Sequence, residues 1–437
     1  MKVLLIAYEF PPIESAQGLR WKYLSRALAE RGHSVVVVTA ALLDPPSSGH
    51  DDAGVHVIRV FAGPFTGTAA ALAGATGLGR APSTGAGAVA RPMSLPERAY
   101  RALRFIGNRM LVPDIRTEWL PWGLAAAKKV IESGHPDVII ASHEPGVDLA
   151  IARRLRRRYR IPVVADIGDP VVSAYTPHWR RGLDAHFERA WLSDVAAVCV
   201  TTQGTREVLR HRIPGLRDTP VEVLSQGYSD DPVRSDAGIG FDEATLELLY
   251  TGTLYARFRS PAPLVRALER VSGARLTVAG YLDGISASAM CSSGSVRYVG
   301  RLPHEQVRAA QYQADVLVNI GNDFDVQIPG KLFEYMGAGR PILHIAHAEN
   351  DASAKFVEDT RCGVVTRASD VDGIVAELLR LKEAKRLGKL DTRRRDAVAA
   401  FSWRNIGSRL ESVLADVVER AARDNGNVAS RSSGNKR

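Results

Sequence analysis

Short apolar runs alternate along the chain with segments in which apolar residues recur every three to four positions. Residues 3–7 are all apolar, and after a proline-containing loop residues 19–31 have helical spacing and end at a glycine. Residues 34–39 then contain four consecutive valines. The order strand, loop, helix, glycine, strand predicts a βαβ unit. Apolar runs of this kind are typical of parallel strands that are buried on both faces.

The first half of the chain continues in the same manner. Four more apolar runs predict strands, with helical segments between most of them: residues 56–60, 137–141, 162–166 and 196–201. This alternation predicts a doubly wound α/β domain over residues 1–230. Residues 62–95 interrupt it with Ala, Gly, Thr and Pro, which indicates a long flexible insertion or, alternatively, a lid or acceptor-side loop.

The second half restarts the alternation after residues 225–240, whose Ser, Asp and Gly indicate a domain boundary. The expected elements are strands at 246–252, 275–279, 296–299, 315–320 and 341–346, and helices at 261–272, 304–314 and from 331. They predict a second α/β domain over residues 231–402. Apolar residues at helical spacing predict a last helix at 403–423, and the polar residues 424–437 are expected to be disordered.

Composition narrows the class of protein. The 437 residues are 45% hydrophobic and 24% charged, which excludes a disordered chain, a collagen-like fibre and a disulfide scaffold. Three widely spaced cysteines indicate a reducing compartment and no structural zinc. The first apolar run is too short for a signal peptide and no run of about 18 apolar residues occurs, so we expect a cytoplasmic protein. The net charge of +9 favours anionic partners.

Two tandem α/β domains are expected to bind ligands beyond the carboxyl ends of their strands. The loop after the first strand leads to Gly18, where helix amides could hold a phosphate or sugar, although a plain turn explains it equally well. His143 follows a later strand and suits acid/base or hydrogen-bonding work, or else helix capping and packing.

Two carboxylates follow the next predicted strand of the first half. Asp166 and Asp169 could serve a metal or act as a base, or they could fix their loop by accepting backbone amides. We favour the structural role for Asp166 and leave Asp169 open. No third ligand lies at metal-binding spacing, so the sequence does not indicate a metal.

The strongest chemical signal lies in the second half. One predicted strand leads into residues that could contact an anion: Gly252, Thr253, Arg257 and Arg259. Further on, a Gly/Pro loop leads through Lys331 into a helix, and this combination offers an anion both free amides and a cation. Glu334 on the first turn can accept two hydrogen bonds from a ribose diol, or it can simply compensate the helix dipole.

At this point the chain resembles glycosyltransferase family 4, retaining enzymes of the GT-B fold. The likeness covers nearly the whole chain. It includes FPP…GLRWKYLSRALAERGHSVVVVT, WLPWGLAAAKKVIESGHPDVIIASHEP, VVADIGDP, VEVLSQGYSDD, LLYTGTLY, VRYVGRLPHEQV and, most specifically, IPGKLFEYMGAGRPIL. The resemblance implies two Rossmann-like, doubly wound α/β domains that face a central cleft. It also implies that the chain crosses back near residues 401–403, so that the C-terminal helix packs on the N-terminal domain.

The resemblance implies transfer of a sugar, with retention of configuration, from a nucleotide-diphosphate donor to a hydroxyl acceptor. The pathway would be glycan, lipid-linked saccharide or natural-product glycoside biosynthesis. Lys331 with Arg257 or Arg259 would neutralise the diphosphate, and Glu334 would bind the ribose. The nucleotide sugar is a co-substrate, and neither a cofactor nor a metal is implied.

The remaining roles follow from the same resemblance. His143 would face the transferred sugar and the acceptor and, like Lys331, would be catalytic. The backbone near Arg301 and Leu302 would contact the base. We expect Glu144 and Asp169 to be candidates for the acceptor side.

One position departs from the family pattern. Many members have two glutamates separated by seven residues, and with Glu334 as the second, the first position is Val326. Asp325 lies nearby but out of register, and the backbone at Ile328 and Gly330 could supply part of the sugar contact. The departure leaves an alternative open, in which the protein binds sugar nucleotides or polyanions without catalysis.

Residues 153–160 contain six arginines in eight positions on a predicted helix. A solvated helix face is the simplest explanation. Peripheral contact with the inner face of an anionic membrane is the second, because many relatives glycosylate lipid-linked acceptors. Nucleic acid is disfavoured as a partner, since no motif with interleaved aromatic residues accompanies the run.

Overall fold

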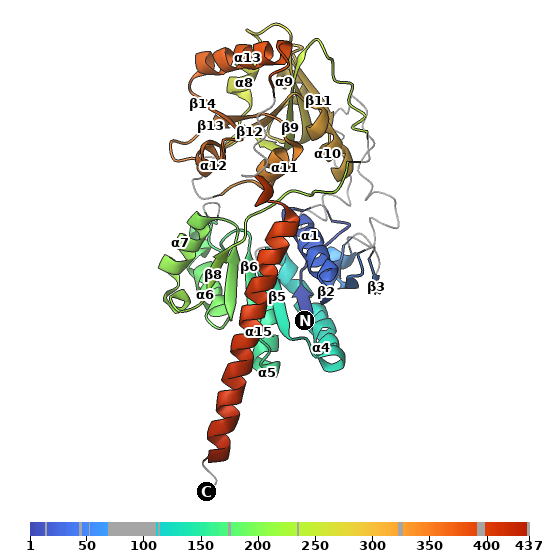
Figure 1. Ribbon diagram of the computed structural model, residues 1–437, viewed down its shortest axis with the longest axis vertical. Coiled ribbons are helices and arrows are strands. Elements are labelled where there is room, and N and C mark those ends of the chain that lie inside the picture. Colours follow the sequence, from blue (N-terminus) through green and yellow to red (C-terminus); the bar gives the residue numbers. More distant parts are fainter. Residues whose placement is uncertain are drawn as a thin grey trace. The chain divides into compact units, whose positions relative to one another are not determined.

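The computed structural model describes residues 1–13, 15–42, 46–51, 53–68, 111, 114–173, 176–233, 236–321, 327–390 and 398–434. Within these residues the chain forms two compact units (Figure 1). The first contains the described residues up to 225 together with those from 406 onward. The second contains the described residues between 226 and 405. Each unit has its own sheet and its own core.

The described part of the first unit is built on an eight-stranded sheet with the order β3-β4-β2-β1-β5-β6-β7-β8. Its strands are β1 (Lys2–Ile6), β2 (Ser34–Ala41), β3 (Ser47–His50), β4 (His56–Phe61), β5 (Val138–His143), β6 (Val163–Ile167), β7 (Ala197–Val200) and β8 (Val221–Val223). Neighbouring strands run parallel, apart from the antiparallel pair β3 and β4. This order is that of a doubly wound sheet, as the apolar runs predict.

Helices connect these strands. They are α1 (Ala16–Glu30), α4 (Leu120–Gly134), α5 (Gly146–Tyr159), α6 (Arg181–Leu192), α7 (Gln203–Arg212) and the short 3₁₀ helices η1 (Ile115–Trp119), η2 (His178–Arg180) and η3 (Pro214–Leu216). The start of α1 is fixed by Ser15, whose side chain accepts a hydrogen bond from the Gly18 amide at 2.9 Å. Such an N-cap satisfies an amide that has no partner within the helix.

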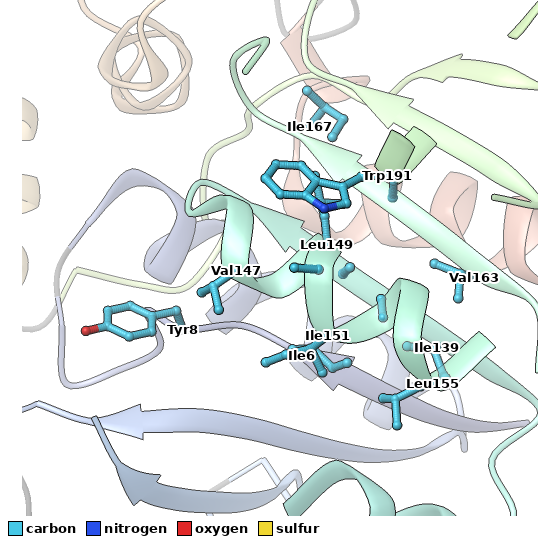
Figure 2. Packing of buried hydrophobic residues seen from close by; sticks show 14 of the residues in the cluster. Ile6, Tyr8, Ile139, Val147, Leu149, Ile151, Leu155, Val163, Ile167 and Trp191 are labelled. Atoms are coloured by element: carbon cyan, nitrogen blue, oxygen red, sulfur yellow. The ribbon is translucent and has the colours of Figure 1, made fainter. Parts of the chain in front are cut away.

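The core of the first unit lies between the central strands and helices α5 and α6. Figure 2 shows Ile6, Ile139 and Val163 of neighbouring strands beside Ile151 of α5 and Trp191 of α6. All five side chains are at most 5% exposed. Because β5 and β6 are buried along their whole length, their last residues are held rigidly where the strands end.

The last helix, α15 (Trp403–Gly434), belongs to the first unit from residue 406 onward. Its residue Glu411 accepts from His33 at 2.7 Å and from Arg31 at 3.2 Å. The helix continues as far as Gly434, beyond the segment 403–423 that the sequence predicts. Once a helix is nucleated, each added residue gains a hydrogen bond, and no proline interrupts this segment.

The second unit has a six-stranded, all-parallel sheet in its described residues, with the order β11-β10-β9-β12-β13-β14. Its strands are β9 (Leu246–Tyr255), β10 (Ala274–Asp283), β11 (Val296–Gly300), β12 (Val316–Ile320), β13 (Ile342–Ala346) and β14 (Gly363–Arg367). Its helices are α8 (Ala262–Leu268), α9 (Ala287–Met290), α10 (His304–Gln313), α11 (Gly330–Ala338), α12 (Ala352–Thr360) and α13 (Val371–Arg386). The two parallel α/β sheets confirm the fold class expected from the sequence.

Some expectations fall partly or wholly outside the described residues. From residue 69 onward, the insertion expected at 62–95 lies outside them, as does Asp325. Within the part of the chain that is described, every helix lacks the length or the apolar character needed to cross a membrane.

Candidate active site

In the second unit, strands β9 and β10 come unusually close where β9 passes Gly252. Gly252 pairs with Gly280 across the two strands, and the two have φ values of +108° and +155°. A Cβ atom added at Gly280 would lie only 1.8 Å from the Gly252 carbonyl oxygen. Only glycine fits both the backbone conformation and the spacing, so this turn keeps its backbone open beside Thr253.

Lys331 lies on the first turn of α11. Its Nζ atom is inaccessible to solvent, makes no hydrogen bond to any described residue, and lies 3.6 Å from the centroid of the Tyr250 ring. Burial and, secondarily, the charge of Arg259 lower the pKa of Lys331 well below its ordinary value. Among the described residues no side chain caps the start of α11. A buried amine without a partner and uncapped helix amides together form a site for an anion.

The two arginine candidates differ in position. Arg259 donates to the Thr253 carbonyl at 3.1 Å and lies 5.7 Å from the Tyr255 ring centroid. Arg257 is exposed. The structure therefore brings Arg259, rather than Arg257, into the electrostatic surroundings of Lys331.

Glu334, one turn after the start of α11, is fixed by helix α10. One carboxylate oxygen lies 3.1 Å from the His304 Nε2 atom, and the other accepts from the Gln311 amide at 3.1 Å. The side chain is 24% exposed, so it is held in place yet accessible. Such a carboxylate can accept hydrogen bonds from a diol.

The other donor-side candidates have different surroundings. Arg301 is exposed at the turn before α10, and Leu302 and Ile328 pack against a core cluster of the second unit. A Cβ atom added at Gly330 would lie 3.6 Å from the Gln226 side chain, so that glycine is not sterically required. Gly18 lies in the first unit, and its amide is already used by the cap of α1.

In the first unit, His143 is the last residue of β5 and is 3% exposed. Its Nδ1 atom has no hydrogen-bond partner among the described residues. Burial lowers the pKa of His143, while the charges of Glu188 and Asp169 oppose this effect. The imidazole is therefore neutral near pH 7, with one ring nitrogen able to bond a ligand.

A pocket of about 560 Å³ opens beside His143. It is lined by Tyr8, Glu9, Leu42, Thr66, Asp114, Ile115, Arg116, His143, Glu144, Pro145, Gly146, Val171, Ser173, Thr176, Pro177, Arg180 and Asp184. Arg116 bonds Asp114 at 3.0 Å and Glu9 at 3.2 Å. Burial raises the pKa of Glu144, and the charge of Arg116 opposes the rise. The pocket is thus a polar recess, rich in carboxyl groups, at the carboxyl end of a sheet.

A buried carboxyl holds Tyr8, one of the residues that line this pocket. Asp148 on α5 is fully buried, and one of its oxygens accepts from the Tyr8 amide at 3.0 Å. The other oxygen has no partner among the described residues. Burial raises the pKa of Asp148 well above its ordinary value, and the hydrogen bond from the Tyr8 amide opposes this rise.

The loop after β1 is tied to the His143 backbone, where Gln17 and, at 2.9 Å, the Gly168 amide both donate to the His143 carbonyl. Asp166 has a structural role, but through the Arg20 side chain rather than through backbone amides. It accepts two hydrogen bonds from Arg20, at 2.8 and 2.9 Å, and both side chains are at most 2% exposed. Asp169 interacts with His143 through its charge and its backbone, and it does not line the pocket.

Sequence reasoning missed several groups at both sites. Tyr8, Arg116 and Asp148 of the first unit carry no recognisable motif. His304 and Gln311 are 30 and 23 residues from the glutamate they hold. Within the described part of the chain, no group of three or more His, Cys, Asp or Glu side chains is placed to hold a metal ion.

Two family models match the chain. Residues 16–227 match the glycosyl transferase 4-like domain, and residues 245–384 match the glycosyl transferases group 1 domain. The two matches cover most of both units and contain His143 and Lys331, respectively. Among curated proteins, no sequence matches the chain.

Solved structures with the same fold are distant in sequence. Sucrose-phosphate synthase from Thermosynechococcus elongatus is 16% identical with a TM-score of 0.68, and the alignment covers 96% of this chain and 100% of that one. HepE from Anabaena, solved with UDP and glucose, is 12% identical with a TM-score of 0.59, covering 95% and 100%. An E. coli trehalose-6-phosphate protein with bound UDP-2-fluoro glucose is 10% identical with a TM-score of 0.56, covering 95% and 99%. These likenesses confirm the fold that the sequence motifs imply.

Proposed function

This chain is a glycosyltransferase of the family 4 type with the GT-B fold, and from that premise we propose that it takes a sugar from a nucleotide-diphosphate donor. The sugar passes to a hydroxyl acceptor with retention of configuration. The observation that carries the proposal is the buried amine of Lys331, which has no hydrogen-bond partner among the described residues and lies at the uncapped start of α11.

In this proposal the donor diphosphate binds at the start of α11. Departure of the diphosphate leaves negative charge, which Lys331, Arg259 and the helix amides stabilise. Because Lys331 has already lost its water, its bond to an anion forms in surroundings of low polarity, where charge interactions are strong. Glu334, held by His304 and Gln311, accepts hydrogen bonds from the two ribose hydroxyls.

Two relatives of similar fold suggest the first donor to test. HepE was solved with UDP-glucose, and the E. coli trehalose-6-phosphate protein with UDP-2-fluoro glucose. We therefore take uridine diphosphate and its glucose ester as the leading candidates for this chain.

The acceptor hydroxyl is proposed to bind in the pocket beside His143. The configuration at the reacting sugar carbon is retained if the acceptor hydroxyl attacks from the face that the diphosphate leaves. A diphosphate oxygen then takes the proton of that hydroxyl. The C–O bond to the leaving group breaks as the new C–O bond forms on the same face. The neutral imidazole of His143 bonds the transferred sugar or the acceptor and orients it.

A second candidate function rests on one position. Val326 stands where many family members carry a glutamate, so a protein that binds sugar nucleotides without transfer is the alternative. The two candidates predict the same ligands and differ only in turnover.

A thermal-shift screen against nucleoside diphosphates and nucleotide sugars tests the donor site. A ligand stabilises the folded protein by RT ln(1 + [L]/Kd), so a true donor raises the melting temperature in a concentration-dependent way. The parent should respond to a diphosphate, and Lys331→Met should respond far less. No shift with any nucleotide would contradict the donor site. A shift without release of diphosphate, even with a broad set of hydroxyl acceptors, would favour the binding protein.

A further inference from the structure

A second pocket of about 410 Å³ lies on the first unit, between α5, α6 and the turn from η1 into α4. Its lining consists of Thr117, Leu120, Val147, Ala150, Arg153, Arg154, Arg157, His186, Phe187, Ala190 and Trp191. One side is therefore basic and the other apolar and aromatic. We call this pocket the α5–α6 groove.

The α5–α6 groove lies next to the pocket beside His143. The two recesses are lined by adjacent residues on two shared elements: Arg116 and Thr117 in η1, and Gly146 and Val147 in α5. On α6, Asp184 lines one and His186 the other. The two recesses are therefore neighbours within the first unit.

The charge of the groove is not balanced within its lining. Three arginines line it, and none of its described lining residues is acidic. The Nε atom of Arg153 is inaccessible to solvent and bonds to none of the described residues. The neighbouring Arg156, by contrast, is paired with Asp194 at 3.1 Å and lies outside the lining. A merely solvated helix face would leave the Nε atom of Arg153 in water as well.

The opposite side of the groove suits a hydrocarbon chain. Phe187 stacks on Trp191 with ring centroids 5.3 Å apart, and Leu120 and Val147 complete the apolar side. An inorganic anion would leave this surface uncovered, and a plain hydrocarbon would leave Arg153 without an acceptor. The ligand that satisfies both sides is an anion attached to an apolar chain.

We propose that the α5–α6 groove binds an amphiphile in which a phosphate is attached to a hydrocarbon chain. If the proposed transfer is correct, this ligand is the acceptor, and its hydroxyl end lies in the pocket beside His143. The same chemistry is presented by a single lipid-linked substrate and by a phospholipid of an anionic bilayer, and the two sources can be separated by experiment.

Calorimetric titration of the full chain tests the groove with defined probes. Monomeric decyl phosphate should bind more tightly than either inorganic phosphate or decyl glucoside, because only it satisfies both sides. Arg153→Gln should weaken decyl phosphate binding roughly tenfold through loss of a charge-assisted hydrogen bond. Arg158→Gln changes the net charge equally on the same helix, but Arg158 does not line the groove, so it serves as the matched control.

Two results would overturn the proposal: equal binding of decyl phosphate and inorganic phosphate, or an equal loss in the two arginine variants. Sedimentation with phosphatidylglycerol and phosphatidylcholine vesicles separates the sources. Pelleting with the anionic vesicles that Arg153→Gln abolishes assigns the site to bilayer lipid. Binding of the monomer without pelleting assigns it to a single lipid substrate.

The test is independent of the donor site. Titration of the same variants with uridine diphosphate should show unchanged affinity, since Lys331 belongs to the other unit. A failure of nucleotide binding with intact decyl phosphate binding would count against the proposed transfer alone.

Discussion

Replacing Lys331 with Met tests two opposite effects of the buried amine. We expect the amine to strengthen diphosphate binding and to lower the stability of the protein without ligand. Met has nearly the same length and keeps the apolar contact with the Tyr250 ring, while the amine is lost. In the free protein this amine is buried without a partner among the described residues. We therefore expect Lys331→Met to weaken diphosphate binding and, at the same time, to stabilise the protein without ligand.

The size of the expected loss of diphosphate affinity in Lys331→Met follows from the bond that is removed. A charge-assisted hydrogen bond contributes roughly 1.5–3 kcal/mol, which corresponds to about a 10–100-fold loss of affinity for a nucleoside diphosphate. Affinity for the free nucleoside should change little, because it lacks the phosphates that Lys331 faces.

The stability gain depends on pH with a definite sign. Burial lowers the pKa of Lys331 in the folded protein below the ordinary 10.5, so over that window the unfolded chain binds a proton that the folded protein does not. Between the lowered pKa and 10.5, the free energy of unfolding therefore rises with pH. Below the lowered pKa, Lys331 destabilises the folded protein by its full amount. Lys331→Met should melt at a higher temperature than the parent at pH 7, and the difference should shrink toward pH 10.5.

Titration calorimetry in two buffers of different ionisation enthalpy measures how many protons the protein takes up when the diphosphate binds. A bound diphosphate raises the pKa of Lys331, so at a pH between the lowered pKa of the free protein and 10.5 the parent should take up a proton on binding and the variant should not. Lys355→Met, which removes an exposed lysine of the same unit, is the control and should change none of these quantities. If Lys331→Met binds the diphosphate as tightly as the parent, the donor site is misplaced.

Three further substitutions test the other groups. His143→Ala should lower turnover about 10²–10⁴-fold with little change in nucleotide affinity, and steady-state kinetics showing full turnover would remove its role. Glu334→Ala should weaken nucleoside and diphosphate alike in calorimetric titration, with a smaller loss for Glu334→Gln; a loss confined to the diphosphate would contradict the ribose contact. Asp166→Ala leaves Arg20 buried without its carboxylate and should lower the free energy of unfolding by roughly 3–5 kcal/mol in urea denaturation, whereas an unchanged midpoint would mean that the pair does not stabilise the fold.

The sheets could be predicted because strands buried on both faces leave a clear apolar signature. The runs that become β1, β5 and β6 lie almost wholly in the core. Strand β3 has no such signature, since Ser47–His50 is exposed and polar and pairs only at the edge of the sheet. Its pairing depends on β4 being already in place, which local sequence does not encode.

The donor site was predictable where its parts are adjacent in sequence. Lys331 and Glu334 share the first turns of one helix, so their spacing alone places them together. The groups that hold them are not local: Tyr250 comes from β9, and His304 and Gln311 come from α10. Such contacts are set by how helices pack on the sheet, and a single sequence does not display them.

The first unit also depends on residues that are made after the second unit. Residues 406 onward belong to it, and Ile406, Leu410 and Leu414 of α15 are almost completely buried. During synthesis these residues emerge only after the whole second unit. The second unit is therefore the first to have all its segments, while the apolar surface of the first unit that packs against α15 stays uncovered until residues 406 onward have been made. A ribosome that stops before residue 406 would release a nascent chain whose earliest-made unit is the unfinished one.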